Sequence, residues 1–207
     1  MRIIMLWRIG DGKMNIYDFD GTIYNGDSTK DIIKYAFKRH PFMVMKCLRN
    51  AKKRNREFLQ GLATFEQVKE DMLAFIFKIQ NYPKFVNDFV ESHMKKIKPL
   101  YKSRHADNDV IVSASYDLWV NLFARKIGVR NVIATRVDTA GKILGINCKG
   151  DEKLRRIQEV LPNIPIENAY TDSRSDEALL VNARNGFVIE GNKVVPYVRG
   201  YKFKKID

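Results

Sequence analysis

The sequence predicts an α/β protein: a mostly parallel sheet with helices on both faces, and a small all-helical insert after the first strand. Two observations lead to this prediction. Residues 107–207 alternate between short apolar runs and amphipathic segments, as in parallel sheets covered by helices. Residues 28–98, by contrast, have helical periodicity almost throughout. We therefore expect a Rossmann-like core of residues 14–26 and 100–207, a helical cap of residues 27–99, and an N-terminal extension of residues 1–13.

Composition narrows the class of protein further. The 207 residues are 45% hydrophobic, which is a globular composition, and no apolar run approaches the roughly 18 residues of a membrane span. Cys47 and Cys148 lie far apart, which fits a reducing compartment, and we expect a cytoplasmic protein. Arg8 interrupts the apolar patch of the extension, so no secretory signal is expected there. The net charge of +13 favours an anionic partner without choosing its kind.

The helical insert carries recognisable start and stop signals. A Ser or Pro at a helix start, a T-x-x-Q capping box and a terminal Pro are typical helix boundaries. They predict four amphipathic helices, packed as a small bundle: one starting at Ser28, one from Pro41 to about Leu59, one after the Thr64–Gln67 box, and one through Phe85 that Pro99 ends.

The second half of the chain predicts the remaining strands and helices. A Gly commonly follows the last turn of a helix, and a Gly-Asn pair commonly turns a hairpin. The expected elements are strands at 109–115, 131–137 and 168–173, a helix over "YDLWVNLFARKIG" that stops at Gly128, a helix at 151–161, a helix over "DEALLVNARNG" that stops at Gly186, and a hairpin at 187–197 that turns at Gly191 and Asn192.

Three of the expected strands end in small polar or acidic residues: Asp18, Ser113 and Asp172. Parallel sheets bind ligands at the carboxyl ends of their strands, so we expect these side chains in one crevice. Asp20 and Asp176 follow closely in the loops. Clustered carboxylates raise one another's pKa, and Lys153 plus a hard divalent cation would compensate them. An oxygen-only ligand set with room for water suits Mg²⁺.

These residues resemble the four motifs of the haloacid dehalogenase-like (HAD) hydrolase superfamily. The segment "DFDGT" (18–22) is similar to its first motif, and "VIVSAS" is similar to its second, with Ser113 at the strand end. "GDEKLRRI" supplies the lysine of the third motif, and "TDSRSDEALL" is similar to the fourth. The match spans Asn15 to about Ile189. The helical insert resembles the C1 cap of the phosphoserine-phosphatase-like branch.

The resemblance assigns a role to each motif residue. It implies that Asp18 is the nucleophile that forms an aspartyl-phosphate, and that Asp20 is the general acid and base. It implies that Mg²⁺ is held by Asp18, Asp172 and Asp20, the last through its main-chain carbonyl. Phosphoryl oxygens would be bound by Ser113 and the Ala114 N–H, the developing charge neutralised by Lys153, and Lys153 or metal-bound water held by Asp176. Asp20 also argues against a dehalogenase, which lacks it, and a transport ATPase, which carries Thr there.

Three positions bear on the substrate. Asp27 matches an acidic residue that follows the first motif in phosphoserine phosphatases, and Arg174 lies beside the expected metal site, where it could touch substrate. Glu70 falls where that branch places a cap arginine for the substrate carboxylate. A glutamate cannot bind a carboxylate, so this departure argues against phosphoserine itself.

Several alternatives stay open at this point. Lys149 competes with Lys153 for the motif lysine, and Asp176 could cap the helix at Glu177. The cationic run "KCLRNAKKRNREF" (46–58) is most often a solvated face, but it allows a second reading of the function. In the first reading the chain is a Mg²⁺-dependent phosphatase that hydrolyses a phosphate monoester of a small metabolite, with no specific nucleic-acid partner. In the second it is a weakly active phosphatase fold that binds nucleic acid or anionic membrane through this run. The chain is not expected to be an integral membrane protein, and its oligomeric state is not assigned.

Overall fold

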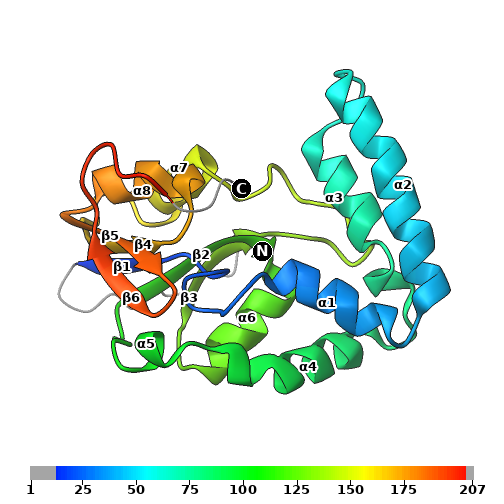
Figure 1. Cartoon of the computed structure of the whole chain (residues 1–207), viewed down its shortest axis with the longest axis horizontal. Coiled ribbons are helices and arrows are strands. Elements are labelled where there is room, and N and C mark those ends of the chain that lie inside the picture. Colours follow the sequence, from blue (N-terminus) through cyan, green and yellow to red (C-terminus); the bar gives the residue numbers. More distant parts are fainter. Residues whose placement is uncertain (1–12, 204–207) are drawn as a thin grey trace.

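The structure is a computed structural model that describes residues 13–203, and it is built around one six-stranded sheet (Figure 1). The strand order is β3-β2-β1-β4-β5-β6. The first five strands run parallel, and β6 is antiparallel to β5. The predicted mostly parallel sheet with helices is confirmed. The predicted N-terminal extension, apart from Lys13, lies outside the described residues.

Strand positions follow the sequence prediction closely. The parallel strands are nearly continuous apolar runs, as expected for strands covered on both faces. Their bounds are β1 Met14–Tyr17, β2 Asp109–Tyr116, β3 Asn131–Thr135, β4 Ile166–Thr171, β5 Asn185–Glu190 and β6 Lys193–Pro196. The β5–β6 hairpin pairs Glu190 with Lys193, so it turns at Gly191 and Asn192 as predicted.

Helices cover both faces of the sheet. Neighbouring residues of a strand point to opposite faces, and here both sets are apolar, so each face packs on helices. Ile16 packs in one apolar cluster with Ile157 of α7 (Asp151–Val160) and with α8 (Glu177–Asn182). Tyr17, the next residue, belongs to a second cluster with α6 (Asp117–Lys126). Figure 1 shows α7 and α8 on one side of the sheet and α6 on the other.

The inserted helices do not form the expected four-helix bundle. Helix α1 (Ser28–Phe37) contacts α2 (Pro41–Leu59), which packs closely on α3 (Phe65–Leu73), and the α2–α3 pair projects away from the sheet (Figure 1). Helix α4 (Tyr82–His93) lies apart from the α2–α3 pair: it packs on α6, where Phe89 meets Phe123 edge to face, and it touches α1 through Tyr35. One apolar cluster thus runs from the sheet into these helices. The domain division at residues 27–99 stays a prediction.

Several element boundaries differ from the prediction. Asp27, not Ser28, caps α1, because its side chain accepts a hydrogen bond from the Lys30 N–H at 2.9 Å. Helix α4 ends before Pro99, which begins the short helix α5 (Pro99–Lys102). Gly186 lies inside β5. Because it has no side chain, its backbone can pass close to the Leu180 carbonyl of α8. The Thr64–Gln67 capping box and the Pro41 start are present as predicted.

Within residues 13–203, every helix is too short or too polar to cross a bilayer.

Candidate active site

A cavity of about 580 Å³ opens beyond the carboxyl ends of β1, β2 and β4. These three strands are neighbours in the sheet, so the polar residues at their ends reach the same space. One wall belongs to the core and carries the motif carboxylates. Helix α3 forms the opposite wall with Phe65, Lys69 and Met72.

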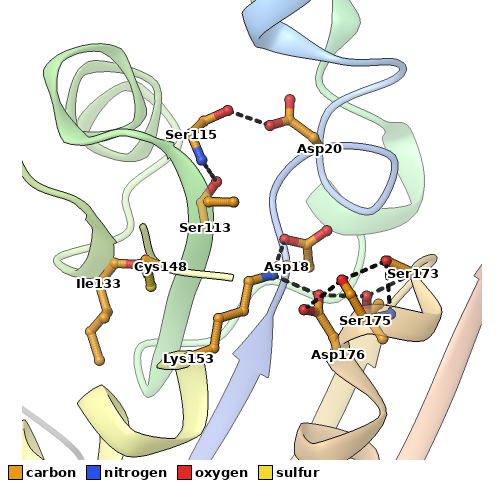
Figure 2. A network of polar contacts seen from close by, with 12 residues as sticks. Asp18, Asp20, Ser113, Ser115, Ile133, Cys148, Lys153, Ser173, Ser175 and Asp176 are labelled. Atoms are coloured by element: carbon orange, nitrogen blue, oxygen red, sulfur yellow. Dashed lines mark hydrogen bonds and ion pairs between the residues drawn. The ribbon is translucent and has the colours of Figure 1, made fainter. Parts of the chain in front are cut away.

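The core wall centres on a buried cluster of two carboxylates and one lysine (Figure 2). Lys153 reaches from α7 to lie between Asp18, which follows β1, and Asp176, with its Nζ 2.6 Å from an oxygen of each. The Thr171 hydroxyl donates to Asp176 at 3.0 Å. Burial disfavours the ammonium, but Asp176 and Asp18 outweigh it and raise the pKa of Lys153. This lysine therefore stays charged and fixes the position of the Asp18 carboxylate.

This cluster separates two of the alternatives that the sequence leaves open. Lys149 also lines the cavity, but its side chain is exposed, whereas Lys153 is 2% exposed and holds Asp18 directly. Asp176 stands at the N-cap position of α8, yet its side chain makes no capping hydrogen bond and faces Lys153 instead.

Asp20 is held by groups from α1 and β2. Its carboxylate accepts hydrogen bonds from the Ser28 N–H and the Ser115 hydroxyl, both at 2.6 Å. Burial raises the pKa of Asp20, and the bonds from Ser115 and Ser28 oppose that rise. Ser113 is buried one step below, and its hydroxyl accepts from the Ser115 N–H at 3.0 Å (Figure 2). Ser115, rather than Ser113, lines the cavity beside Ala114.

Asp172 lies against the loop that follows β1. A Cβ on Gly21 would come 1.9 Å from a carboxylate oxygen of Asp172, and Gly21 has φ +76°, so only glycine leaves room for this approach. Burial raises the pKa of Asp18, Lys153 lowers it, and Asp176 and Asp172 raise it again, with a net rise. Burial is thus the largest cause of the raised pKa, and the neighbouring carboxylates of Asp176 and Asp172 add to it.

The donors at this wall fit a hard divalent cation. Asp18 and Asp172 offer carboxylate oxygens beside an open cavity, and Gly21 leaves the space that Asp172 occupies. Across residues 13–203 no group of three or more His, Cys, Asp or Glu side chains has metal-binding geometry. The predicted ligand set has only two carboxylate side chains, Asp18 and Asp172, because Asp20 was expected to contribute its main-chain carbonyl, and its side chain faces Ser115. This ligand set stays a prediction.

The predicted substrate-binding residues are divided in space. Asp27 and Ala114 line the cavity. One oxygen of Asp27 caps α1, and the other pairs with Lys30 at 3.1 Å. Arg174 lies exposed on the 3-10 helix η4 (Arg174–Asp176), outside the cavity wall. The cations of the 46–58 run do not line the cavity either, within the described chain.

Sequence reasoning missed Lys69, the main cation of the helical wall. Lys69 is 6% exposed, and its Nζ lies 2.8 Å from Asn147 Oδ1 and also bonds the Ala114 carbonyl. Both partners are neutral, and burial lowers the pKa of Lys69 to about 8. Phe65, Lys69 and Met72 are spaced i, i+4, i+7, the pattern of one helix face, which would have identified this lysine.

Glu70, the neighbouring residue, does not face the cavity. Its carboxylate pairs with Lys142 at 2.8 Å and accepts from the Ile143 N–H at 2.8 Å. Glu70, at the position of the expected cap arginine, therefore anchors α3 to the loop after β3. The cation that faces the cavity is Lys69, one residue earlier in the chain. A second missed lysine is Lys98, which is buried and donates to the Gly21 and Gly191 carbonyls. Its run, "MKKIKPLYK", holds three more lysines of similar context, so no sequence signal distinguishes it.

Comparison with known proteins agrees with this geometry. Residues 16–180 match the family described as haloacid dehalogenase-like hydrolase. Protein CicA of Caulobacter vibrioides is 32% identical over 188 residues, covering 81% of each chain. The phosphoserine phosphatase of Methanocaldococcus jannaschii is 23% identical over 190 residues, covering 83% of this chain and 82% of its own.

Solved structures share the fold. A protein of unknown function from Bordetella pertussis aligns with a TM-score of 0.65 and 20% identity, covering 84% of this chain and 88% of its own. A phosphoserine phosphohydrolase-like protein from Francisella tularensis aligns with a TM-score of 0.53 and 16% identity, covering 84% and 85%. The four motifs, the sheet order and the family match agree, and this chain belongs to the haloacid dehalogenase-like hydrolase family, with phosphoserine phosphatases among its relatives.

Proposed function

We propose that the chain is a Mg²⁺-dependent phosphatase that hydrolyses a phosphate monoester of a small metabolite through an aspartyl-phosphate. One observation carries the proposal: Asp18 lies at the floor of the cavity, held at 2.6 Å by the buried Lys153, with Asp20 two residues away. A carboxylate that is fixed and open to a ligand cavity is placed to act as a nucleophile.

The two aspartates divide the chemistry. A carboxylate oxygen of Asp18 forms a bond to phosphorus while the bond from phosphorus to the ester oxygen breaks, and protonated Asp20 gives its proton to that leaving oxygen. Water then attacks the phosphorus of the aspartyl-phosphate, Asp20 takes the proton, and Asp18 and inorganic phosphate are released. The raised pKa of Asp20 favours the protonated form that the first step needs.

The other groups bind and orient the phosphoryl group. Lys153 compensates the charge beside Asp18, and the Ser115 hydroxyl fixes the direction of the Asp20 carboxylate. Asp18 and Asp172, with the Asp20 main-chain carbonyl, are the residues that would hold Mg²⁺. When bound, the ion supplies electrostatic stabilisation of the phosphoryl oxygens.

Lys69 supports a substrate that carries a second anionic group. Its buried ammonium has only neutral hydrogen-bond partners, and it faces the cavity from the wall opposite Asp18. A carboxylate or second phosphate on the substrate would supply the missing counter-charge. The departure at Glu70 argued only against phosphoserine itself, whereas Lys69 favours a class of substrate, phosphate esters with a second anionic group.

The test is release of inorganic phosphate from a panel of phosphorylated metabolites, with the Asp18→Asn variant as the blank. We expect turnover by the wild type that stops with EDTA and returns with added Mg²⁺, and that Ca²⁺ restores poorly because its coordination is larger and looser. Asp18→Asn preserves the side-chain volume and should lose turnover by more than about 10³-fold.

Controls separate chemistry from folding. Circular dichroism and the melting temperature should match between wild type and Asp18→Asn. Full activity of Asp18→Asn would remove the nucleophile from the mechanism, and full activity in excess EDTA would remove the metal.

A further inference from the structure

The outward face of α2 has an unusual composition for a solvated helix. Its buried stripe is short and consists of Val44, Cys47 and Ala51. Large apolar side chains stand on the opposite side, where Phe42 is 86% exposed, Met45 49% and Leu59 75%. Leu62, in the turn that follows, is 75% exposed. Scattered apolar residues are ordinary on a surface, but four along one projecting hairpin form a group.

Cations lie between these apolar side chains. On a helix with 100° per residue, the cations and the apolar residues of α2 fall within the same outward half-turn. The cations are Lys46, Arg49, Lys52, Lys53 and Arg56, all exposed. None of the five forms an ion pair with a carboxylate of residues 13–203. Arg54, which faces Asp71 of α3, binds the one acidic residue of α2, Glu57. We name the five cations with Phe42, Met45, Leu59 and Leu62 the α2 face.

The position of the α2 face allows contact with an extended surface. Helix α2 lies at the outer edge of the pair that projects from the body of the protein (Figure 1). The face runs along a helix about five turns long, and α3, not α2, lines the cavity.

The geometry points to an anionic lipid surface as the occupant: we propose that the α2 face docks this enzyme on membranes that carry negatively charged headgroups. A basic helix with interspersed Phe and Leu lies in a membrane interface, its cations at the phosphates and its apolar side chains at the acyl boundary. A nucleic acid would neutralise the cations and leave Phe42 and Leu59 in water.

The experiment is co-sedimentation of the full chain with vesicles of phosphatidylcholine alone or with about 30% phosphatidylserine added. We expect at least about ten-fold stronger binding to the anionic vesicles, lost at high salt because the interaction is screened. Two variants separate the contributions. Lys52→Gln/Lys53→Gln/Arg56→Gln removes charge, and Phe42→Ser/Leu59→Ser/Leu62→Ser removes apolar area. Each should weaken binding to the anionic vesicles by at least about five-fold.

A matched control carries the same change of net charge on the core. Lys102→Gln/Arg125→Gln/Arg130→Gln removes three exposed cations of α5, of α6 and of the segment before β3, and it should bind as the wild type does. All three variants alter exposed residues outside the cavity, so hydrolysis of a small aryl phosphate should stay unchanged and report a native fold.

Three results would overturn the proposal. The first is equal binding to neutral and anionic vesicles, or no binding to either. The second is an equal loss for the core control, which would assign the effect to net charge. The third is a Ser variant that binds anionic vesicles normally while a short DNA duplex competes fully, which would assign the face to nucleic acid.

Discussion

The cavity has two buried lysines on opposite walls, and their surroundings differ in one respect. Lys153 lies between two carboxylates, which raise its pKa despite burial. Lys69 has a carbonyl and an amide oxygen as partners, and burial lowers its pKa to about 8. The charge of Lys153 is already neutralised by these two carboxylates, and the lysine serves to hold Asp18 in position. The second lysine has no carboxylate among its hydrogen-bond partners, and Asp20 and Asp27 only partly oppose the fall of its pKa, so an anionic ligand can pair with it. Equal burial thus produces a positioning group on one wall and a recognition group on the other.

Replacing Lys153 with Met should have the largest effect. The change leaves Asp18 and Asp176 buried and facing each other without a cation, and breaking a buried ion pair in this way costs about 3–5 kcal/mol. We expect a melting temperature lower by 10 °C or more, on the order that such a loss implies. Phosphate release should fall to the level of the Asp18→Asn blank.

The same substitution on the other wall sharpens the comparison. Lys69→Met should change the free energy of unfolding by less than about 1 kcal/mol, because Thr135 Oγ1 also lies within hydrogen-bond distance of the Ala114 and Asn147 oxygens. Equal destabilisation by the two Met variants would mean that both lysines are structural.

Gly21→Ala tests how closely Asp172 packs against the loop after β1. The new Cβ would lie 1.9 Å from Asp172, and φ +76° costs an L-residue about 1–2 kcal/mol. We expect kcat to fall by about 100-fold and the Mg²⁺ concentration for half-maximal activity to rise, since Asp172 must move away from Asp18. Gly61→Ala is the matched control, with φ +74° and no atom near its Cβ, and it should lose stability alone. Equal kcat values for the two variants would contradict the close packing of Asp172.

Lys69 also gives a pH dependence whose sign can be derived. Below about pH 8 its ammonium is charged and binds an anionic substrate tail, and above that pH the group becomes neutral and the attraction is lost. The kcat/KM for an acid-tailed ester, divided by that for a neutral-tailed ester, should therefore fall as pH rises through about 8. The ratio cancels the titration of Asp20 and of the phosphate, because both substrates share them.

The Lys69→Met variant provides the control for that profile. It should lower kcat/KM for the acid-tailed ester by about 10- to 100-fold, mainly through KM, and flatten the ratio across the pH range. Lys69→Arg should keep the preference and move its loss to higher pH, because the guanidinium does not deprotonate there. An unchanged ratio in Lys69→Met would exclude this lysine from substrate recognition.

The core wall was largely predictable from the sequence, and the helical wall was not. Asp18 and Asp172 follow apolar strands directly, so their place at the sheet edge comes from strand order and burial alone. The lysine of α7 was predicted because "GDEKLRRI" resembles the third motif of the family, although Lys149 remained an alternative until burial separated them.

Helix phase explains most of what the sequence missed. An assignment shifted by one residue rotates a helix by 100°, and this shift placed Glu70 where Lys69 lies. The same holds for Ser28, which lies one residue after the true cap. The pairing of α4 with α6 depends on contacts between segments far apart in the chain, which local periodicity does not report.

Arg174→Gln should have the smallest effect, and it tests whether nearness in sequence or placement in the cavity decides a role. Arg174 is two residues from Asp172, which made it a candidate for substrate contact, but the structure leaves it exposed and outside the cavity wall. Its charge is screened by water at that position, so we expect kcat/KM for the acid-tailed ester to change by less than about two-fold. Arg125→Gln, an equally exposed cation on α6, sets the background for loss of one surface charge. A fall of ten-fold or more in this kcat/KM for Arg174→Gln alone, with the melting temperature unchanged, would show that η4 brings the side chain to the bound substrate. The core wall would then recognise the substrate as well as position the nucleophile.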